Sequence, residues 1–299
     1  MKNMEGWVDL SFKILPDGSV RDIYIIEEMP ADSFAKEAMK AVEKYRFSFE
    51  RNNQKILIDE PKFATQRINF KLSNSETGLS KKQQDYLDEL IDRAEKGEVD
   101  AQYNYAYLFD TYLQKKGEID GEKINQWLFN AAVDGVTDAQ YRLGQNIYSG
   151  NDCKVEKQKG LDWIMQAAQI GNAKAQYMAY TLLTSKDIIN QTNLSPFYWL
   201  QQSAENGLNI AQLHYAKEIA LMDSPTNEQI NTASKYLEDY ANTIYETAQW
   251  YQVNAMLLDK TNKHSAAVKS VKKALKSAEK LGWDLTELEQ LKTAIINNK

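Results

Sequence analysis

The sequence predicts an α+β protein in which a small strand-and-helix domain precedes an all-α solenoid. A block built on Ala-Gln-Tyr or Ala-Gln-Leu recurs four times, at separations of 38, 36 and 36 residues. A fixed period of this length is the signature of a helical repeat array. The first 72 residues lack the repeat and instead show the two-residue alternation of β-strands.

Each copy of the repeat is expected to form two helices, one with the Ala-Gln block and one with a tryptophan. The Ala-Gln blocks begin at Ala101, Ala139, Ala175 and Ala211. Tryptophans spaced 36 residues apart are expected to fill the groove between neighbouring helices: Trp127, Trp163 and Trp199. Glycines stand where the preceding helix should stop in a left-handed C-cap: Gly97, Gly135, Gly171 and Gly207. One pair cannot bury its own apolar face, so stacked pairs supply the core.

Two strands are predicted at the start of the chain. Residues 6–15 alternate apolar and polar side chains, which is typical of a strand buried on one face. The Pro-Asp-Gly-Ser sequence at residues 16–19 favours a turn, and residues 20–27 return as the second strand.

A helix and a third strand complete a ββαβ unit. After Pro30, either Asp32 or Ser33 is expected to cap the helix. The last alternating run, residues 66–72, can lie at the edge of the sheet with free backbone groups. The domains are therefore expected at residues 1–72, 85–225 for the repeats and 226–299 for a helical cap, with a polar linker over 73–84.

The repeats resemble a known family at their most regular unit. The stretch LGQNIYSGNDCKVEKQKGLDWIMQAAQIGNAKAQY, residues 143–177, is similar to the Sel1-like repeat, a relative of the tetratricopeptide repeat. The resemblance implies a solenoid that binds proteins. From residue 228 onward the pattern stays helical but loses the motif, which favours further tetratricopeptide-like helices that close the array.

Four stretches of the first domain carry a second resemblance: GWVDLSFKILPDGSV, IIEEMPADSF, EAMKAVEKYRFSF and RINFKL. Together they resemble the C-terminal domain of the TonB energy-transducer family. Ser48 and Phe49 stand where that family usually has a proline. The family's preceding Tyr-Pro helix, Pro-rich spacer and membrane anchor do not occur in this sequence, so an adaptor or a processed fragment of a transducer is expected.

The resemblance to TonB implies a way of binding. In that family the short TonB box of an outer-membrane receptor pairs with the last strand, a mode called β-augmentation. By position, the contact would fall on six residues: Gln66, Arg67, Ile68, Asn69, Phe70 and Lys71. The backbone would supply affinity, and the outward side chains of Arg67, Asn69 and Lys71 would tune specificity.

The residues that carry chemistry are few. The chain has two histidines, His214 and His264, and one cysteine, Cys153. No metal-ligand spacing, phosphate-binding loop or catalytic grouping occurs, so we expect no metal, no cofactor and no enzyme activity. His214 is expected to make a local hydrogen bond on a helix face, and Cys153 is expected to be buried as a small apolar residue.

The charge distribution argues against nucleic acid as the main partner. Residues 1–72 carry 12 basic and 12 acidic side chains, so the formal charge of −6 lies wholly on the remaining sequence. Five lysines share one side of a predicted helix and are expected to form a solvated face rather than an anion or membrane-surface site. They are Lys269, Lys272, Lys273, Lys276 and Lys280.

The function predicted from these features is protein binding in the cell envelope, in support of TonB-dependent outer-membrane transport. A periplasmic location is expected if a signal or anchor precedes the sequence, and a cytoplasmic location is the alternative. One rival function is a pure repeat scaffold in which the first domain only caps the solenoid. Another is an enzyme or regulator of cell-wall material, with the 17 tyrosines forming a sugar groove.

No run of apolar residues in the sequence is long enough to span a membrane.

Overall fold

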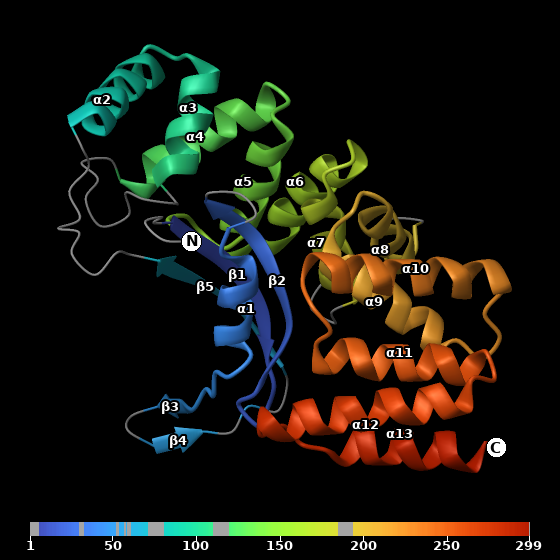
Figure 1. Cartoon of the computed structure of the whole chain (residues 1–299). Helices are drawn as coiled ribbons and strands as arrows, with labels where there is room; N and C mark the ends of the chain where they lie inside the picture. The colour runs from blue at the N-terminus through green and yellow to red at the C-terminus, as the bar shows by residue number, and fades with distance from the viewer. Residues whose placement is uncertain are drawn as a thin grey trace. The chain divides into compact units, whose positions relative to one another are not determined.

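The computed structural model describes residues 6–29, 33–51, 54–56, 58, 61–70, 81–109, 120–184 and 194–298 (Figure 1). By packing, the chain forms two compact units. The first unit joins Met1–Ser75 to Asn209–Lys299, and the second is Glu76–Leu208. The boundaries expected from the sequence motifs stay predictions. The α+β fold class is confirmed: a small antiparallel sheet comes first, and a helical solenoid follows.

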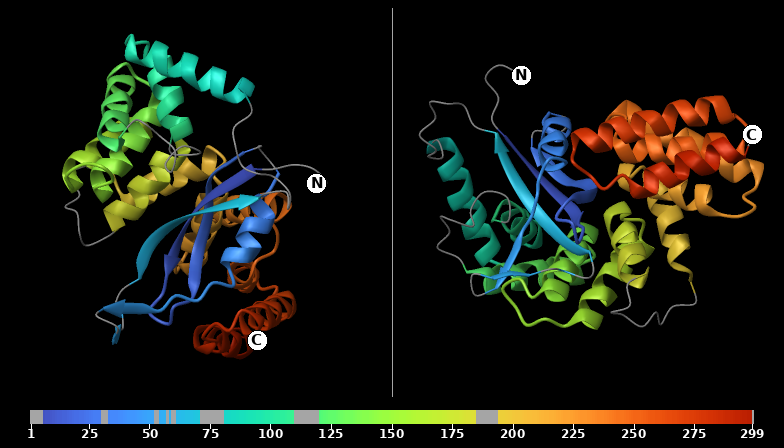
Figure 2. Two further views of the ribbon diagram at one scale, coloured as in Figure 1. Left: turned by 90° about the vertical axis from the view of Figure 1, so that its left-hand side faces the viewer. Right: turned by 90° about the horizontal axis from the view of Figure 1, so that it is seen from below.

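The sheet of the first unit has three strands in the order β2-β1-β5. They are β1 (Gly6–Ile14), β2 (Val20–Met29) and β5 (Lys62–Phe70). Both neighbours pair antiparallel with β1, which is therefore the central strand. Figures 1 and 2 show the strands side by side, with the C-terminal helices of the same unit beyond β2.

The central strand is buried on more than one face. Val8, Leu10, Phe12 and Ile14 form the expected apolar face, and none is more than 4% exposed. Trp7 is also buried, on the opposite face, at 1% exposed. The prediction of a half-buried strand was wrong in this respect, because the guanidinium of Arg67 lies over the Trp7 ring on the second face, and Ser11 on that face is also buried.

Helix α1 (Ala35–Val42) packs on the apolar face and is capped from outside itself. Its N-cap is Phe34, which gives no side-chain cap, so the expected capping by Ser33 was wrong; Asp32 lies outside the described residues. The Glu28 carboxylate accepts hydrogen bonds from the backbone N–H of Phe34 and of Ala35, both at 2.9 Å. A residue of β2 thus satisfies the first turn of the helix.

A short hairpin lies between α1 and the last strand. It pairs β3 (Phe49–Arg51) with β4 (Gln54–Ile56), which the sequence patterns did not predict. Strand β5 begins at Lys62, four residues before the alternating run that predicted it. The longer strand pairs along the whole of β1, from Lys62 opposite Ile14 to Phe70 opposite Gly6.

Five helices complete the first unit: α9 (Asn209–Leu221), α10 (Asn227–Thr243), α11 (Ala248–Lys260), α12 (His264–Lys280) and α13 (Thr286–Asn297). Consecutive helices pack on one another. Helix α10 starts with a capping box, in which Thr226 and Gln229 exchange side-chain to backbone bonds. Small residues such as Ala274 and Ala278 are fully buried where α12 meets its neighbours.

The second unit is a stack of helices in chain order: α2 (Lys81–Glu95), α3 (Val99–Leu108), α4 (Gly121–Val133), α5 (Thr137–Ser149), α6 (Lys157–Gln169), α7 (Ala173–Thr184) and α8 (Pro196–Glu205). Each helix packs against the next one in sequence, as in a solenoid. The Ala-Gln blocks of this unit lie on α3, α5 and α7, and the tryptophans lie on α4, α6 and α8.

The repeat glycines have the left-handed backbone expected of them, and the repeat tryptophans are buried or partly buried between helices. The glycines Gly97, Gly135, Gly171 and Gly207 have φ angles of 90°, 93°, 101° and 85°. Trp127 and Trp199 are buried, at 4% and 2% exposed, whereas Trp163 is partly buried and meets Phe129 edge to face. The lone cysteine, Cys153, is exposed in the turn after α5, so its expected burial was wrong.

A ladder of buried glutamines links the repeats of the second unit. Gln102, Gln140 and Gln176 each donate from Nε2 to the carbonyl oxygen eight residues earlier, at 3.0 Å. Their Oε1 atoms are acceptors for the next helix pair: Asn130 donates to Gln102 and Asn206 donates to Gln176, both at 2.9 Å. The Oε1 of Gln140 is buried and has no hydrogen-bond partner among the described residues.

Replacing Ile170 by asparagine is expected to stabilise the array. Ile170 is the C-cap of α6, the position that Asn206 holds in α8, and it is 65% exposed. An asparagine there can donate to Gln140 as Asn206 does to Gln176, which is worth about 1 kcal/mol. Thermal unfolding of Ile170→Asn should show a higher melting temperature than wild type, while the same Ile170→Asn change in a Gln140→Leu background should show no such gain. An unchanged or lowered melting temperature for Ile170→Asn would contradict the geometry.

Candidate protein-binding site

Strand β5 lies at one edge of the three-stranded sheet. Its pairing partner is β1, and among the described residues the ladder ends at β5. Alternate backbone N–H and C=O groups of such a strand point away from the sheet and can pair with an added strand. Of the six residues predicted to carry the contact, Gln66 to Phe70 are in β5, and Lys71 lies outside the described residues.

The side chains of β5 divide between the two faces of the sheet. Ile68 pairs with Val8, and the Phe70 ring stacks on the ring of Phe34, with centroids 4.4 Å apart, on the face covered by α1. Gln66 and Asn69 are exposed. Among Gln66 to Phe70, these two are the exposed side chains, and the other three are partly buried.

Arg67 is held within the domain. Its Nε donates to Asp9 Oδ1 at 2.7 Å, its Nη2 pairs with Asp9 Oδ2, and its guanidinium lies 4.5 Å above the Trp7 ring. A two-point bond of this kind fixes the planar guanidinium in one orientation. The expectation that Arg67 tunes specificity as a free outward side chain therefore stays a prediction, and its observed contact is with the central strand.

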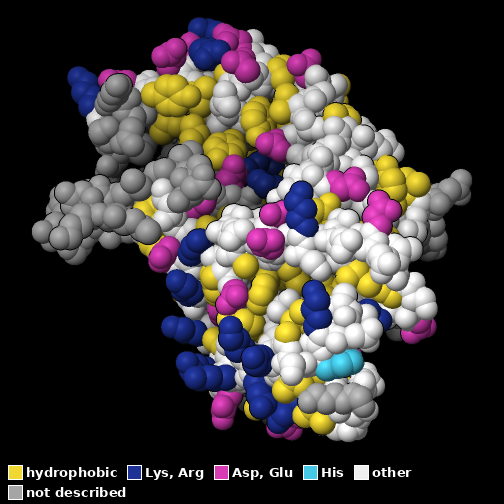
Figure 3. Space-filling view, turned by 45° about the vertical axis from the view of Figure 1, so that its right-hand side comes forward, with side chains coloured by type: hydrophobic (Ala, Val, Ile, Leu, Met, Phe, Trp, Pro, Cys, Tyr) yellow, Lys and Arg dark blue, Asp and Glu magenta, His cyan; other side chains and the backbone are white. Residues whose placement is uncertain are grey.

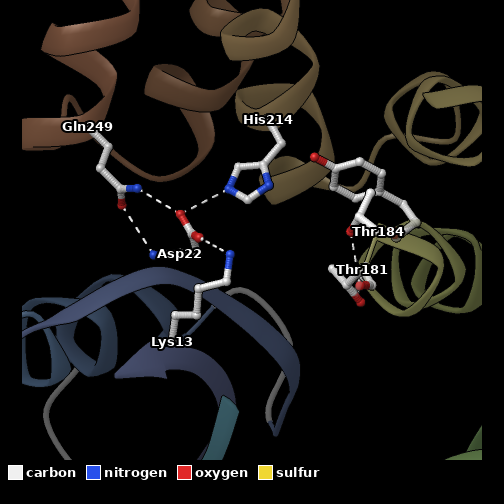
Figure 4. Close-up of polar contacts among 7 residues, drawn as sticks. Lys13, Asp22, Thr181, Thr184, His214 and Gln249 are labelled. Atoms are coloured by element: carbon white, nitrogen blue, oxygen red, sulfur yellow. Dashed lines mark hydrogen bonds and ion pairs between the residues drawn. The ribbon is translucent and has the colours of Figure 1, made fainter. Parts of the chain in front are cut away.

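The opposite edge of the sheet is tied to the helices of the same unit through Asp22. Asp22 lies in β2 with a φ of 51°, at a bulge where β2 has one residue more than β1. Its Oδ1 accepts hydrogen bonds from Gln249 of α11 at 2.8 Å and contacts Nε2 of His214 of α9 at 3.0 Å. Its Oδ2 pairs with the Lys13 ammonium at 2.9 Å (Figure 4). We call these four residues the interlock.

The neighbours of Asp22 in the interlock stabilise its negatively charged carboxylate. Burial alone would raise the pKa of the Asp22 carboxyl, but His214 and Lys13 outweigh burial and hold this pKa well below its usual range. The backbone N–H of Asp22 also donates to Gln249 at 3.3 Å. His214 thus contacts a residue 192 positions away, which the sequence did not predict, and its expected local hydrogen bond stays a prediction.

A second contact fastens the same strand to the turn after α12. The Arg21 guanidinium lies 3.2 Å from the centroid of the Trp283 ring, and Trp283 is buried. Burial lowers the pKa of Arg21 to about 10, although nearby acidic side chains oppose that shift. Lys40 of α1 lies over the ring of Tyr245, at 5.4 Å, in the turn between α10 and α11. The sheet domain and the last five helices therefore share one interface.

Sequence reasoning missed Asp22, Gln249 and Trp283. The one local signal was the broken alternation of residues 20–25, where an acidic residue sits among apolar ones. A break of this kind is typical of a bulge. Nothing local marks Gln249 or Trp283, because their partners are more than 200 residues away in the chain.

Comparison with known families agrees with the two parts of the structure. Residues 1–72 match the family described as the Gram-negative bacterial TonB protein C-terminal. The match covers the sheet domain that holds the β5 edge and the Asp22 bulge. A comparison with curated proteins found no match.

Two of the solved structures similar to this chain are Sel1-type repeat proteins. A Sel1 repeat protein from Oxalobacter formigenes aligns over 69% of this chain and 58% of its own, with 21% identity and a TM-score of 0.50. A protective antigen of uropathogenic Escherichia coli strains, displaying an SLR fold, aligns over 63% of this chain and 40% of its own, with 19% identity and a TM-score of 0.50. The chain therefore spans about half the length of these proteins. At this identity the likeness establishes the fold.

The sheet domain therefore matches a TonB C-terminal family, and the helical part shares the fold of Sel1 repeat proteins. In the described part of the chain, no three metal-ligating side chains gather as a metal site would require. Nor does any described helix combine the length and apolar character needed to cross a bilayer.

Proposed function

We propose that this chain is a cell-envelope adaptor that binds protein partners through two surfaces. The first is the edge of β5, which takes a TonB-box-type segment of an outer-membrane receptor as an added strand. The second is the Sel1-like array, which binds another protein. The adaptor would support TonB-dependent transport from the periplasm. The observation that carries the first surface is the position of β5 at the end of the ladder.

The arrangement of the first unit supports this role for β5. The other edge of the sheet is already used, because Asp22 and Arg21 of β2 bond to α9, α11 and the turn after α12. Strand β5 offers nine residues of backbone, enough for several ladder bonds with an extended peptide. Gln66 and Asn69 are exposed beside that backbone and can read a partner's side chains.

A peptide-binding experiment tests the proposal. The full chain is titrated with synthetic peptides that carry TonB boxes of outer-membrane receptors, and with scrambled versions of the same composition. We expect the box peptides alone to bind, with the largest amide chemical-shift changes in β5 and smaller ones in β1. Binding that leaves β5 unperturbed, or equal binding of scrambled peptides, would contradict strand addition at this edge.

A second function, the pure scaffold, is favoured by the interlock. The contacts of Asp22, His214 and Gln249 join the TonB-like domain to the last helices of the chain, as a structural cap would be joined. In that case the recognition of partners belongs to the repeat array alone. The two functions differ in one result: a scaffold binds none of the TonB-box peptides, yet still captures a partner from envelope extracts.

A further inference from the structure

Helix α12 presents a continuous basic side to solvent. It is 17 residues long, about 25 Å at the rise of an α-helix. Its buried side consists of small residues and one valine. Its exposed lysines recur at steps of three and four residues, and we call them the α12 lysine face: Lys269, Lys272, Lys273, Lys276 and Lys280.

The charges of this face are not neutralised within the protein. Among the described residues, Lys269, Lys272, Lys276 and Lys280 make no ion pair, and Lys273 contacts only the ring of Tyr251, at 5.0 Å. Glu279 is the only acidic residue of the helix. The whole chain has a net charge of −6, so this face is a local reversal of sign.

Basic residues of the TonB-like domain extend the same surface. A Cβ placed on Gly282, two residues after Lys280, would lie 3.2 Å from Nη2 of Arg46. Arg46 and Lys44 are exposed at the end of α1. Figure 3 shows Lys and Arg side chains gathered over the lower part of this view, with few acidic side chains among them.

We propose that the α12 lysine face binds the surface of an anionic phospholipid bilayer. The lysines lie along one straight side of a rigid helix, which fits a flat surface of diffuse negative charge. They are compact point charges, whereas two-point recognition of a defined carboxylate or phosphate uses arginine. None of the large exposed apolar side chains in the described residues lies on α12, so the helix rests on the head groups and does not insert.

The proposal predicts a steep dependence on charge and on salt. Each lysine near an anionic membrane contributes about fivefold to the partition coefficient, and this contribution fades as salt shortens the Debye length. Removing three of the five lysines should therefore weaken binding roughly 100-fold. The fold should be unaffected, because these side chains are exposed and carry no ion pair.

The test is co-sedimentation of the full chain with phosphatidylcholine vesicles, with and without about 30% phosphatidylglycerol. The test variant is Lys269→Gln/Lys272→Gln/Lys276→Gln. The matched control is Lys154→Gln/Lys159→Gln/Lys235→Gln, which removes the same charge from exposed positions on other elements. We expect wild type and the control to bind anionic vesicles only, and the test variant to lose most of that binding.

Any of the following outcomes would overturn the proposal. One is vesicle binding that is equal in the test and control variants, or equal on neutral vesicles. Another is failure of the wild type to bind anionic vesicles while it binds a polyglutamate peptide or a DNA duplex through the same lysines, which would assign the face to a different polyanion. Binding that survives high salt would also contradict an electrostatic contact.

Discussion

Proline at one of positions 67 and 68 is expected to abolish the binding of an extended partner peptide while the sheet stays folded. Consecutive residues of an edge strand point their N–H groups in opposite directions, so one of Arg67 and Ile68 faces β1 and the other faces the free edge. A proline at the outward position removes a donor that only the partner uses. An unpaired partner carbonyl costs about 1–3 kcal/mol, or roughly 5- to 150-fold in affinity.

The pair of prolines supplies its own control. Each proline also removes a side-chain contact, that of Arg67 with Asp9 or that of Ile68 beside Val8, so each is compared with alanine at the same position. Relative to that alanine variant, the inward proline removes a bond of the native ladder and should lower the melting temperature, whereas the outward one should lower it much less. Gln66→Ala and Asn69→Ala keep the backbone intact and should weaken peptide binding only several-fold, because they remove side-chain contacts alone. If both proline variants stay folded and bind the TonB-box peptides as the wild type does, the partner does not add to β5.

The elements predicted correctly were those encoded by local periodicity. The alternation around Val8 and Leu10 placed β1, and the spacing of the Ala-Gln blocks placed the helix pairs of the array. The edge position of β5 was also predicted, because the sequence indicated a sheet of three strands and placed this strand last in the chain. Period and turn chemistry act over a few residues, so they can be read from the sequence without any knowledge of tertiary contacts.

The errors came from contacts that join distant segments. The cap of α1 is a carboxylate of β2, Glu28, and not a residue next to the helix. The contact of His214 with Asp22 was missed because nothing in the sequence identifies the two residues as partners. The hairpin of β3 and β4 is too short to show a pattern. These features depend on tertiary contacts or on very short elements, and neither can be predicted from a period in the sequence.

Replacing Asp22 by asparagine is expected to destabilise the first unit by about 3 kcal/mol. Removing one member of a buried charged pair leaves its partners without compensation, and here these are Lys13 and His214. Asparagine tolerates the left-handed φ of 51° at this position, so the loss reports the charge and not backbone strain. Denaturant unfolding, followed by hydrogen exchange in β2 and α9, measures it.

His214→Ala gives the second arm of a double-mutant cycle. If Asp22 and His214 act together, the double variant Asp22→Asn/His214→Ala should cost clearly less than the sum of the two single variants. A control is His264→Ala, because His264 contacts Asp259 within the C-terminal helices and not the TonB-like domain. Additive losses for Asp22 and His214 would mean that the contact between β2 and α9 carries no coupling energy.

The pH dependence of the same variant gives an independent check. His214 and Lys13 hold the pKa of Asp22 in the folded protein well below its usual range, although burial opposes this shift. A depressed carboxyl stabilises the fold fully above its unfolded pKa and loses that contribution as the pH falls through its folded pKa. The part of the unfolding free energy that wild type gains over Asp22→Asn from this carboxylate should therefore shrink as the pH falls below about 4. A difference that is undiminished at about pH 2 would show that the Asp22 charge does not join the TonB-like domain to the helices.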